Sequence, residues 1–253
     1  MRTLAVIPAR LGATRLPRKP LRLLGGLPLV LRVWERVRET RVADDCVIAT
    51  DSTEVAAVAA EHGADVVLTR SDHPSGTDRV AEVAARSEYR RFDCVINVQG
   101  DEPFVSADAL TGAAGLITSG AFPLATAAAL ASPDILPNPN IVKVVAADDG
   151  RALYFSRAPI PYLRDPDDRS ILEGRIHHHI GVYAYHRDAL ARWVAMTPHP
   201  LELIERLEQL RPLAAGMAMG VAVVKEPPRG GIDTEDDLAR ANSDWTALTP
   251  VRT

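Results

Sequence analysis

Residues 95–103 have the sequence VINVQGDEP, which joins the pattern of a buried strand to a polar, acidic end. Residues 95–98 are predicted to form a strand, which would deliver Gln99, Asp101 and Glu102 to its carboxyl end, and Gly100 would allow close approach of backbone there. A carboxylate at that end suits a Mg²⁺ ion that bridges phosphates, because Mg²⁺ prefers oxygen ligands. The alternative is an aspartate in an ordinary turn. It would not explain why this acidic strand end converges with the cationic loop described below.

Strand and helix patterns alternate on the N-terminal side of this stretch. Predicted strands cover residues 4–8, 47–50, 66–68 and 95–98. Between them, residues 29–37, 55–59 and 80–84 repeat apolar side chains every three or four positions, which predicts amphipathic helices. This order predicts the α/β class: a Rossmann-like, mostly parallel sheet flanked by helices, with a ligand crevice at the carboxyl ends of the strands.

The second half has longer strand patterns, at residues 122–130, 141–146 and 181–185, joined by proline-rich loops. One amphipathic helix is predicted over residues 202–211 and a buried strand over 221–224. Thr234 is predicted to cap a last helix, with Asp237 in the position of a capping box. The chain is therefore predicted to be a single domain, residues 1–253, with a smaller β-rich lobe inserted within about residues 133–200.

Composition excludes several functional classes. The formal charge of −4 and the lack of a concentrated basic patch argue against nucleic-acid binding. No apolar run approaches the roughly 20 residues needed to cross a bilayer, and no signal-peptide pattern is present, so a cytoplasmic protein without a membrane partner is expected. Cys46 and Cys94 lie in apolar runs and are predicted to be buried, reduced thiols. Only Lys19, Lys143 and Lys225 are lysines.

The loop after the first strand, residues 8–21, carries an unusual concentration of positive charge. Arg10, Arg15, Arg18 and Lys19 lie among small residues and prolines in an otherwise acidic protein. A solvated basic loop is the alternative, but the position at the carboxyl edge of the predicted sheet favours a polyphosphate-binding loop. The glycine patterns of a P-loop and of a dinucleotide fingerprint are both absent.

Two further segments are candidates for the same ligand site. The sequence DHPSGTDR, residues 72–79, opens a predicted helix, where Ser75 or Thr77 would cap and the helix start would suit a polar ligand. The sequence GGID, residues 230–233, places Asp233 just before the last helix. Taken alone, the first segment is a weak signal, and the second is more often ordinary helix capping.

Together these segments resemble the 3-deoxy-manno-octulosonate (Kdo) cytidylyltransferases, a family of the nucleotide-diphospho-sugar transferase type. The resemblance covers essentially the whole chain in order. Its matching pieces include PAR (8–10), KPL (19–21), ATD (49–51), SGT (75–77), NVQGDEP (97–103), NPN (138–140), VKVV (142–145), ALYFSR (152–157), HIGVY (179–183) and LEQLR (207–211). One departure is Arg18, which stands where a glycine is expected.

The resemblance implies an enzyme that converts CTP and Kdo to CMP-Kdo and pyrophosphate for lipopolysaccharide-type glycans, with Mg²⁺ as cofactor and a homodimer formed through the β-rich lobe. It implies catalytic roles for Lys19, Asp101 and Asp233, with both aspartates binding the metal. The residues implied for the nucleotide are Ala9, Arg10, Arg15, Lys19, Ser75, Gly76 and Gln99. Those implied for the sugar are Gln99, Arg157, His179, Tyr183, Glu208 and Gln209.

Two alternatives remain open at this point. The sugar could be a sialic acid or an amino-substituted Kdo, since one changed hydroxyl is a local difference. A non-catalytic nucleotide-sugar sensor on the same fold is the second alternative, although a sensor has no need of the complete set Lys19, Asp101 and Asp233.

Overall fold

A computed structural model describes residues 1–12 and 15–248; Ala13 and Thr14, part of the predicted polyphosphate loop, lie outside the described residues. The chain folds as two compact units. Unit 1 comprises Met1, Asp93–Ile96 and Ser106–Pro228, and unit 2 comprises Arg2–Phe92, Asn97–Val105 and Arg229–Thr253. The predicted β-rich lobe falls within unit 1, and its description as an insertion in a single domain stays a prediction.

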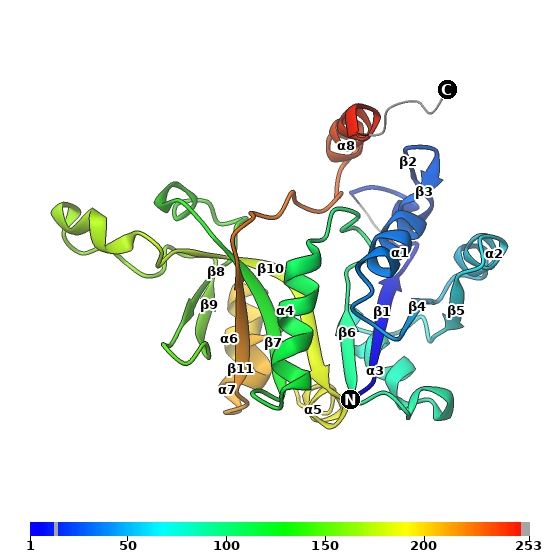
Figure 1. Cartoon of the computed structure of the whole chain (residues 1–253), viewed down its shortest axis with the longest axis horizontal. Helices are drawn as coiled ribbons and strands as arrows, with labels where there is room; N and C mark the ends of the chain where they lie inside the picture. The colour runs from blue at the N-terminus through cyan, green and yellow to red at the C-terminus, as the bar shows by residue number, and fades with distance from the viewer. Residues whose placement is uncertain (13–14, 249–253) are drawn as a thin grey trace. The chain divides into compact units, whose positions relative to one another are not determined.

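Unit 2 has the Rossmann-like strand and helix order. Its elements are β1 (Thr3–Ala9), η1 (Lys19–Leu21), β2 (Leu23–Leu24), β3 (Leu27–Pro28), α1 (Leu29–Thr40), β4 (Asp45–Thr50), α2 (Thr53–Glu61), β5 (Asp65–Leu68), α3 (Gly76–Ala85), η2 (Ser87–Tyr89) and α8 (Glu235–Leu248). Strands β1, β4 and β5 pair in parallel, and α1, α2 and α3 pack against them (Figure 1). The interior residues of β1 are fully buried because both faces of the sheet are covered.

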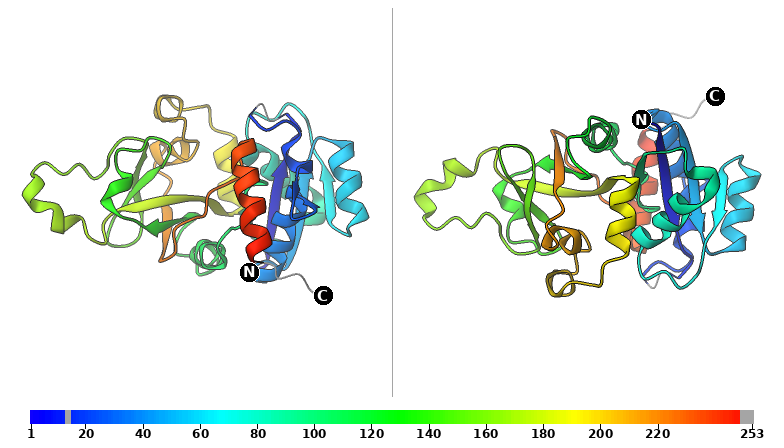
Figure 2. Two further views of the ribbon diagram at one scale, coloured as in Figure 1. Left: turned by 90° about the horizontal axis from the view of Figure 1, so that it is seen from above. Right: turned by 90° about the horizontal axis from the view of Figure 1, so that it is seen from below.

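A small apolar cluster ties the two ends of unit 2 together. Leu16 and Leu24 from the first loop pack with Leu29, Ile232 and Leu238, so that α8 lies against the segment that contains β2 (Figure 2). The N-terminus of α8 has the predicted capping box: the Asp237 amide donates to Thr234 Oγ1 and the Thr234 amide donates to Asp237 Oδ2, at 3.1 and 2.9 Å.

Unit 1 is built on a mixed sheet. Its elements are β6 (Cys94–Asn97, whose last residue belongs to unit 2), α4 (Ala107–Thr118), β7 (Leu124–Leu130), η3 (Pro133–Ile135), β8 (Lys143–Ala146), β9 (Ala152–Ser156), η4 (Pro166–Leu172), β10 (His177–His186), α5 (Arg187–Val194), α6 (Pro200–Glu205), α7 (Leu210–Ala214) and β11 (Met219–Val224). Strand β7 pairs in parallel with β11 and antiparallel with β10, and α4 packs against all three (Figure 1).

The predicted fold class is confirmed, with local corrections. The sequence analysis did not predict β9, and β10 begins four residues before the predicted 181. The single helix predicted over residues 202–211 is wrong: α6 ends at Glu205, Arg206 has the left-handed φ of 55°, and α7 begins at Leu210. This break changes the phase of the apolar face, so Leu203 is exposed while Leu207 is buried.

Both cysteines are buried and free, as predicted. Burial raises the pKa of the Cys46 thiol to about 12, so the thiol is not a reactive nucleophile at neutral pH. No helix within residues 1–12 and 15–248 is both long enough and apolar enough to cross a membrane.

Candidate active site

The first loop of unit 2 turns sharply just before Lys19. Arg18, where glycine was expected, has φ 57° and ψ 31° in the left-handed region that glycine favours. The turn is therefore the one a glycine would form, at a steric cost of about 1 kcal/mol for a residue with a Cβ. Lys19 then begins η1, and the buried Leu16 and Leu24 on either side hold the loop against the core of unit 2.

Lys19 joins two aspartates that are far apart in sequence. Its Nζ lies 2.5 Å from Asp101 Oδ2 and 2.8 Å from Asp233 Oδ1. Arg15 Nη2 adds a contact of 3.0 Å to Asp233 Oδ2. Burial lowers the pKa of Lys19, but the charges and hydrogen bonds of the two carboxylates outweigh burial and raise it above its usual value. The three residues assigned to catalysis therefore converge on one point in unit 2.

Backbone contacts hold the two aspartates in place. The Ile232 amide donates to the Asp101 carbonyl at 2.9 Å, which joins the Gly-Gly segment to the residues after β6. A Cβ on Gly231 would lie 3.0 Å from Glu102 Oε1, so a glycine there lets the segment approach closely. Burial raises the pKa of Glu102 to about 7, and the charges of Asp101 and Asp233 add to this effect. Glu102 is thus a third acid at the same place, to which the sequence analysis gave no role.

Three of the segments assigned to the nucleotide lie side by side in unit 2. A Cβ on Gly100 would lie 2.7 Å from the Pro8 carbonyl oxygen and 3.7 Å from Ala9 Cβ. A Cβ on Gly76 would lie 3.4 Å from Pro8 Cγ and 3.9 Å from Gln99 Oε1. Ala9, Gly76 and Gln99 are therefore neighbours, and the close approach of backbone expected at Gly100 is made by the first loop. Arg10, in the same loop, is exposed.

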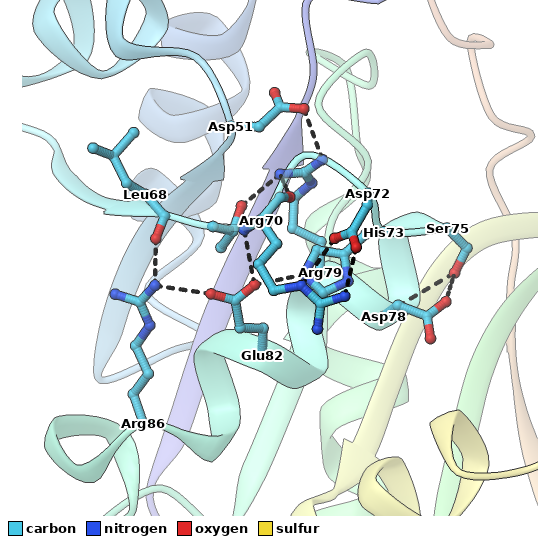
Figure 3. A network of polar contacts seen from close by, with 11 residues as sticks. Asp51, Leu68, Arg70, Asp72, His73, Ser75, Asp78, Arg79, Glu82 and Arg86 are labelled. Atoms are coloured by element: carbon cyan, nitrogen blue, oxygen red, sulfur yellow. Dashed lines mark hydrogen bonds and ion pairs between the residues drawn. The ribbon is translucent and has the colours of Figure 1, made fainter.

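The loop before α3 is held by a dense polar network (Figure 3). Ser75 caps the helix, because its Oγ accepts from the Asp78 amide and donates to the Asp78 carboxylate. Behind this turn, the buried Arg79 donates to the Arg70 carbonyl at 3.2 Å and to Asp51 Oδ2 at 3.2 Å. The network fixes the helix start at which Ser75 and Gly76 present their polar groups.

A histidine–glutamate contact completes this network (Figure 3). His73 Nε2 lies 2.5 Å from Glu82 Oε2, and Glu82 also accepts from the Arg70 amide and from Arg86. Burial by itself would raise the pKa of Glu82, but these hydrogen bonds outweigh it and lower the pKa to about 2. Glu82 is therefore ionised at neutral pH and anchors the segment that precedes Ser75.

The residues assigned to the sugar, apart from Gln99, lie in unit 1. Arg157 follows β9 and is half-buried; its Nε donates to the Glu205 carbonyl at 2.9 Å and its Nη1 to the Pro139 carbonyl at 3.1 Å. His179 and Tyr183 lie on β10 with ring centres 5.5 Å apart, and His179 Nε2 contacts Thr126 Oγ1 at 2.9 Å. Burial lowers the pKa of His179 to about 3, so its imidazole is neutral.

The break between α6 and α7 presents Glu208 and Gln209. Burial is the main cause that raises the pKa of Tyr183 well above its usual value, and the charges of Tyr185 and Glu208 add to it. Gln209 is 2% exposed, and its Nε2 has no hydrogen-bond partner among the described residues. A buried amide without a partner is costly unless a ligand or water satisfies it.

The chain is similar to known cytidylyltransferases. The chain matches the family model described as Cytidylyltransferase over residues 4–219. It is 63% identical to the 3-deoxy-manno-octulosonate cytidylyltransferase of Gemmatimonas aurantiaca over 98% of this chain and 96% of that protein. It is 46% identical to the protein of the same name from Polynucleobacter asymbioticus, over 94% of this chain and 93% of that protein.

A solved structure of CMP:2-keto-3-deoxy-manno-octonic acid synthetase complexed with CTP matches with a TM-score of 0.90 at 35% identity, covering 98% of this chain and 100% of that one. A putative glucose-1-phosphate thymidylyltransferase from Bacillus anthracis shares the fold at a TM-score of 0.64 and 13% identity, covering 96% of this chain and 95% of that one. The predicted resemblance is confirmed along the length of the sequence, and the chain belongs to the 3-deoxy-manno-octulosonate cytidylyltransferase family.

Proposed function

We propose that the protein is a nucleotidyltransferase that couples CTP to Kdo, giving CMP-Kdo and pyrophosphate. Membership of the family supports this activity. Within the structure, the supporting observation is the convergence of Lys19, Asp101 and Asp233 beside the first loop of unit 2. A sensor would bind a nucleotide without needing two carboxylates and a lysine at one point.

Unit 2 supplies the residues proposed for CTP. The neighbouring Ala9, Gly76 and Gln99 offer close backbone approach and polar edges to a small base. The Ser75 cap places the start of α3, with its free amide groups, beside them. Arg10, Arg15 and Lys19 would offset the charge of the triphosphate.

Asp101 and Asp233 are proposed to hold Mg²⁺. Their oxygens both contact one cationic atom, Lys19 Nζ, which supports the proposal that the pair holds a cation. Within residues 1–12 and 15–248 no group of three or more His, Cys, Asp or Glu residues is arranged to hold a metal. Two carboxylates with the remaining ligands from phosphate and water are what Mg²⁺ usually takes in such sites. When bound, the metal would supply Lewis-acid polarisation of the α-phosphate and orient the attacking hydroxyl.

Unit 1 supplies the residues proposed for the sugar acid. Arg157 would bind its carboxylate, and His179, Tyr183, Glu208 and Gln209 its hydroxyls. The family resemblance implies Gln99 for both substrates. In the reaction the anomeric oxygen bonds to the α-phosphorus while the bond to pyrophosphate breaks. Lys19 and the loop arginines would stabilise the departing pyrophosphate, so the rate comes from positioning and charge neutralisation.

Pyrophosphate release on mixing with CTP, Mg²⁺ and Kdo tests the activity. Asp101→Asn and Asp233→Asn are each expected to lose most turnover while the fold survives, and the double variant should be little worse, as for residues that act as a unit. Asp236→Asn is the matched control, because it removes the same charge from an exposed residue in the first turn of α8. Full activity in Asp233→Asn would mean that Asp233 only supports the start of α8, and it would contradict the metal assignment.

The same assay separates the alternatives. Faster turnover with a sialic acid or an amino-substituted Kdo would change the substrate but keep the reaction. CTP binding without pyrophosphate release for any sugar acid would indicate a sensor. We also propose a role in lipopolysaccharide-type glycan synthesis, as expected from the family, and a cytoplasmic location without nucleic-acid or membrane partners, as expected from the sequence.

We further propose a homodimer formed through the β-rich lobe of residues 133–200. Leu153, Tyr162 and Ile171 of this lobe are more than half accessible, and burying them against a second copy of the chain would stabilise a dimer. Light scattering at micromolar concentration should give twice the chain mass, and a monomer would refute the proposal.

A further inference from the structure

Lys143 is a lysine buried completely within unit 1. It lies on β8, is 0% exposed, and pairs in register with Ser156 of β9. Its Nζ donates to the carbonyls of Arg157, Ile141 and Asn138 at 2.6, 2.7 and 2.9 Å. An ammonium has three N–H donors. All three are therefore used by main-chain carbonyls, and none is left for a substrate.

The three carbonyls connect two segments on which Arg157 depends. Asn138 and Ile141 belong to the loop before β8, and Arg157 follows β9. The same loop accepts a bond from the Arg157 side chain, since Nη1 donates to the Pro139 carbonyl. Lys143 thus binds the main-chain carbonyl of Arg157. It also binds carbonyls on both sides of Pro139, whose own carbonyl accepts from the Arg157 guanidinium.

Glu205 also holds Arg157 in place. Its Oε2 accepts from the Arg157 amide at 2.9 Å and its Oε1 from Ser156 Oγ at 2.6 Å, while its carbonyl accepts from Arg157 Nε at 2.9 Å. The bonds to the described chain use two of the five guanidinium donors, so the remaining ones are free to bind a planar carboxylate. Such recognition depends on orientation, which the Lys143 and Glu205 contacts fix.

We infer that Lys143 is a positioning residue for the sugar acid: it fixes Arg157 through main-chain carbonyls and does not itself bind the substrate. This inference rests on the proposed function of Arg157. A lysine that binds main-chain carbonyls differs from one that binds the substrate. The carbonyls require N–H donors, whereas a substrate carboxylate would require the positive charge. The two roles therefore predict different results for a neutral donor at position 143.

Lys143→Met removes the donors at similar side-chain length and is expected to raise the KM for Kdo roughly tenfold to hundredfold, with the dissociation constant of CTP unchanged. Lys143→Gln restores two N–H donors without charge and should recover part of this loss. Lys225→Met, the same substitution at an exposed lysine of unit 1, should change neither quantity. An unchanged KM for Kdo in Lys143→Met would overturn the inference.

A double-variant cycle tests whether Lys143 acts through Arg157. In an Arg157→Ala background, the further change Lys143→Met should raise the KM for Kdo by less than about twofold, because the group that Lys143 positions is already gone. Effects that multiply would mean direct substrate binding and would overturn the inference. Loss of the folded state in both position-143 variants, measured by thermal unfolding, would make Lys143 a folding residue and overturn it too. Failure of the unmodified protein to use Kdo would instead refute the proposed function.

Discussion

The Arg211–Glu202 ion pair is expected to make a large contribution to the stability of unit 1. Arg211 on α7 donates from Nε to Glu202 Oε2 at 2.8 Å and from Nη2 to Oε1 at 2.5 Å, across the break that separates α6 from α7. Glu202 also accepts from the His199 amide. Burial would raise the pKa of Glu202, but these bonds outweigh it and lower that pKa, so the carboxylate is charged at neutral pH.

Arg211→Met leaves this carboxylate buried without its counter-charge. Both side chains of the pair are only 10% exposed, so solvent screens the loss poorly. Removing one partner of a buried pair costs about 3–5 kcal/mol. For a protein of this size each kcal/mol lowers the melting temperature by about 2–4 °C. The expected loss is therefore roughly 6–20 °C.

Differential scanning calorimetry measures this loss, with Arg169→Met as the matched control. Arg169 pairs with Asp134 on the surface, with side chains 67% and 80% exposed, and such pairs contribute only about 0–1 kcal/mol. Adding Glu202→Gln to Arg211→Met should recover part of the stability, because the unpaired charge is removed. A loss in Arg211→Met no larger than in Arg169→Met would refute the reasoning.

Three further predictions concern unit 2. Gly100→Ala should lower the free energy of unfolding by about 1–3 kcal/mol and weaken CTP binding, because its Cβ would lie 2.7 Å from the Pro8 carbonyl oxygen. In Gly76→Ala the new Cβ makes only an ordinary 3.4 Å contact, so the melting temperature should stay within about 2 °C. The lowered pKa of Glu82 gives stability that is present above pH 4.5 and lost as the pH falls toward 2; Glu82→Gln should flatten this part of the melting-temperature profile, and an unchanged profile would exclude Glu82 as its source. Turnover should be far higher with CTP than with UTP or ATP in the pyrophosphate assay, and comparable rates would remove the base selectivity proposed for unit 2.

The sequence by itself determined the fold class and predicted the edge of the sheet at which the candidate site lies. Local patterns suffice for this, because apolar periodicity and helix caps such as Thr234 act within a few residues, and parallel strands place their carboxyl ends at one edge. The motifs around Lys19 and Asp101 also carried the family resemblance, which the relatives confirm.

Only the tertiary structure decided which distant residues meet. The contact of Lys19 with both Asp101 and Asp233, the left-handed turn at Arg18 and the break at Arg206 depend on packing that no local pattern records. Lys143 illustrates the reason: the sequence marks it as one of few lysines, but its three acceptors are carbonyls, which every residue possesses. Because every residue has a main-chain carbonyl, the folded backbone decides which of them Lys143 binds.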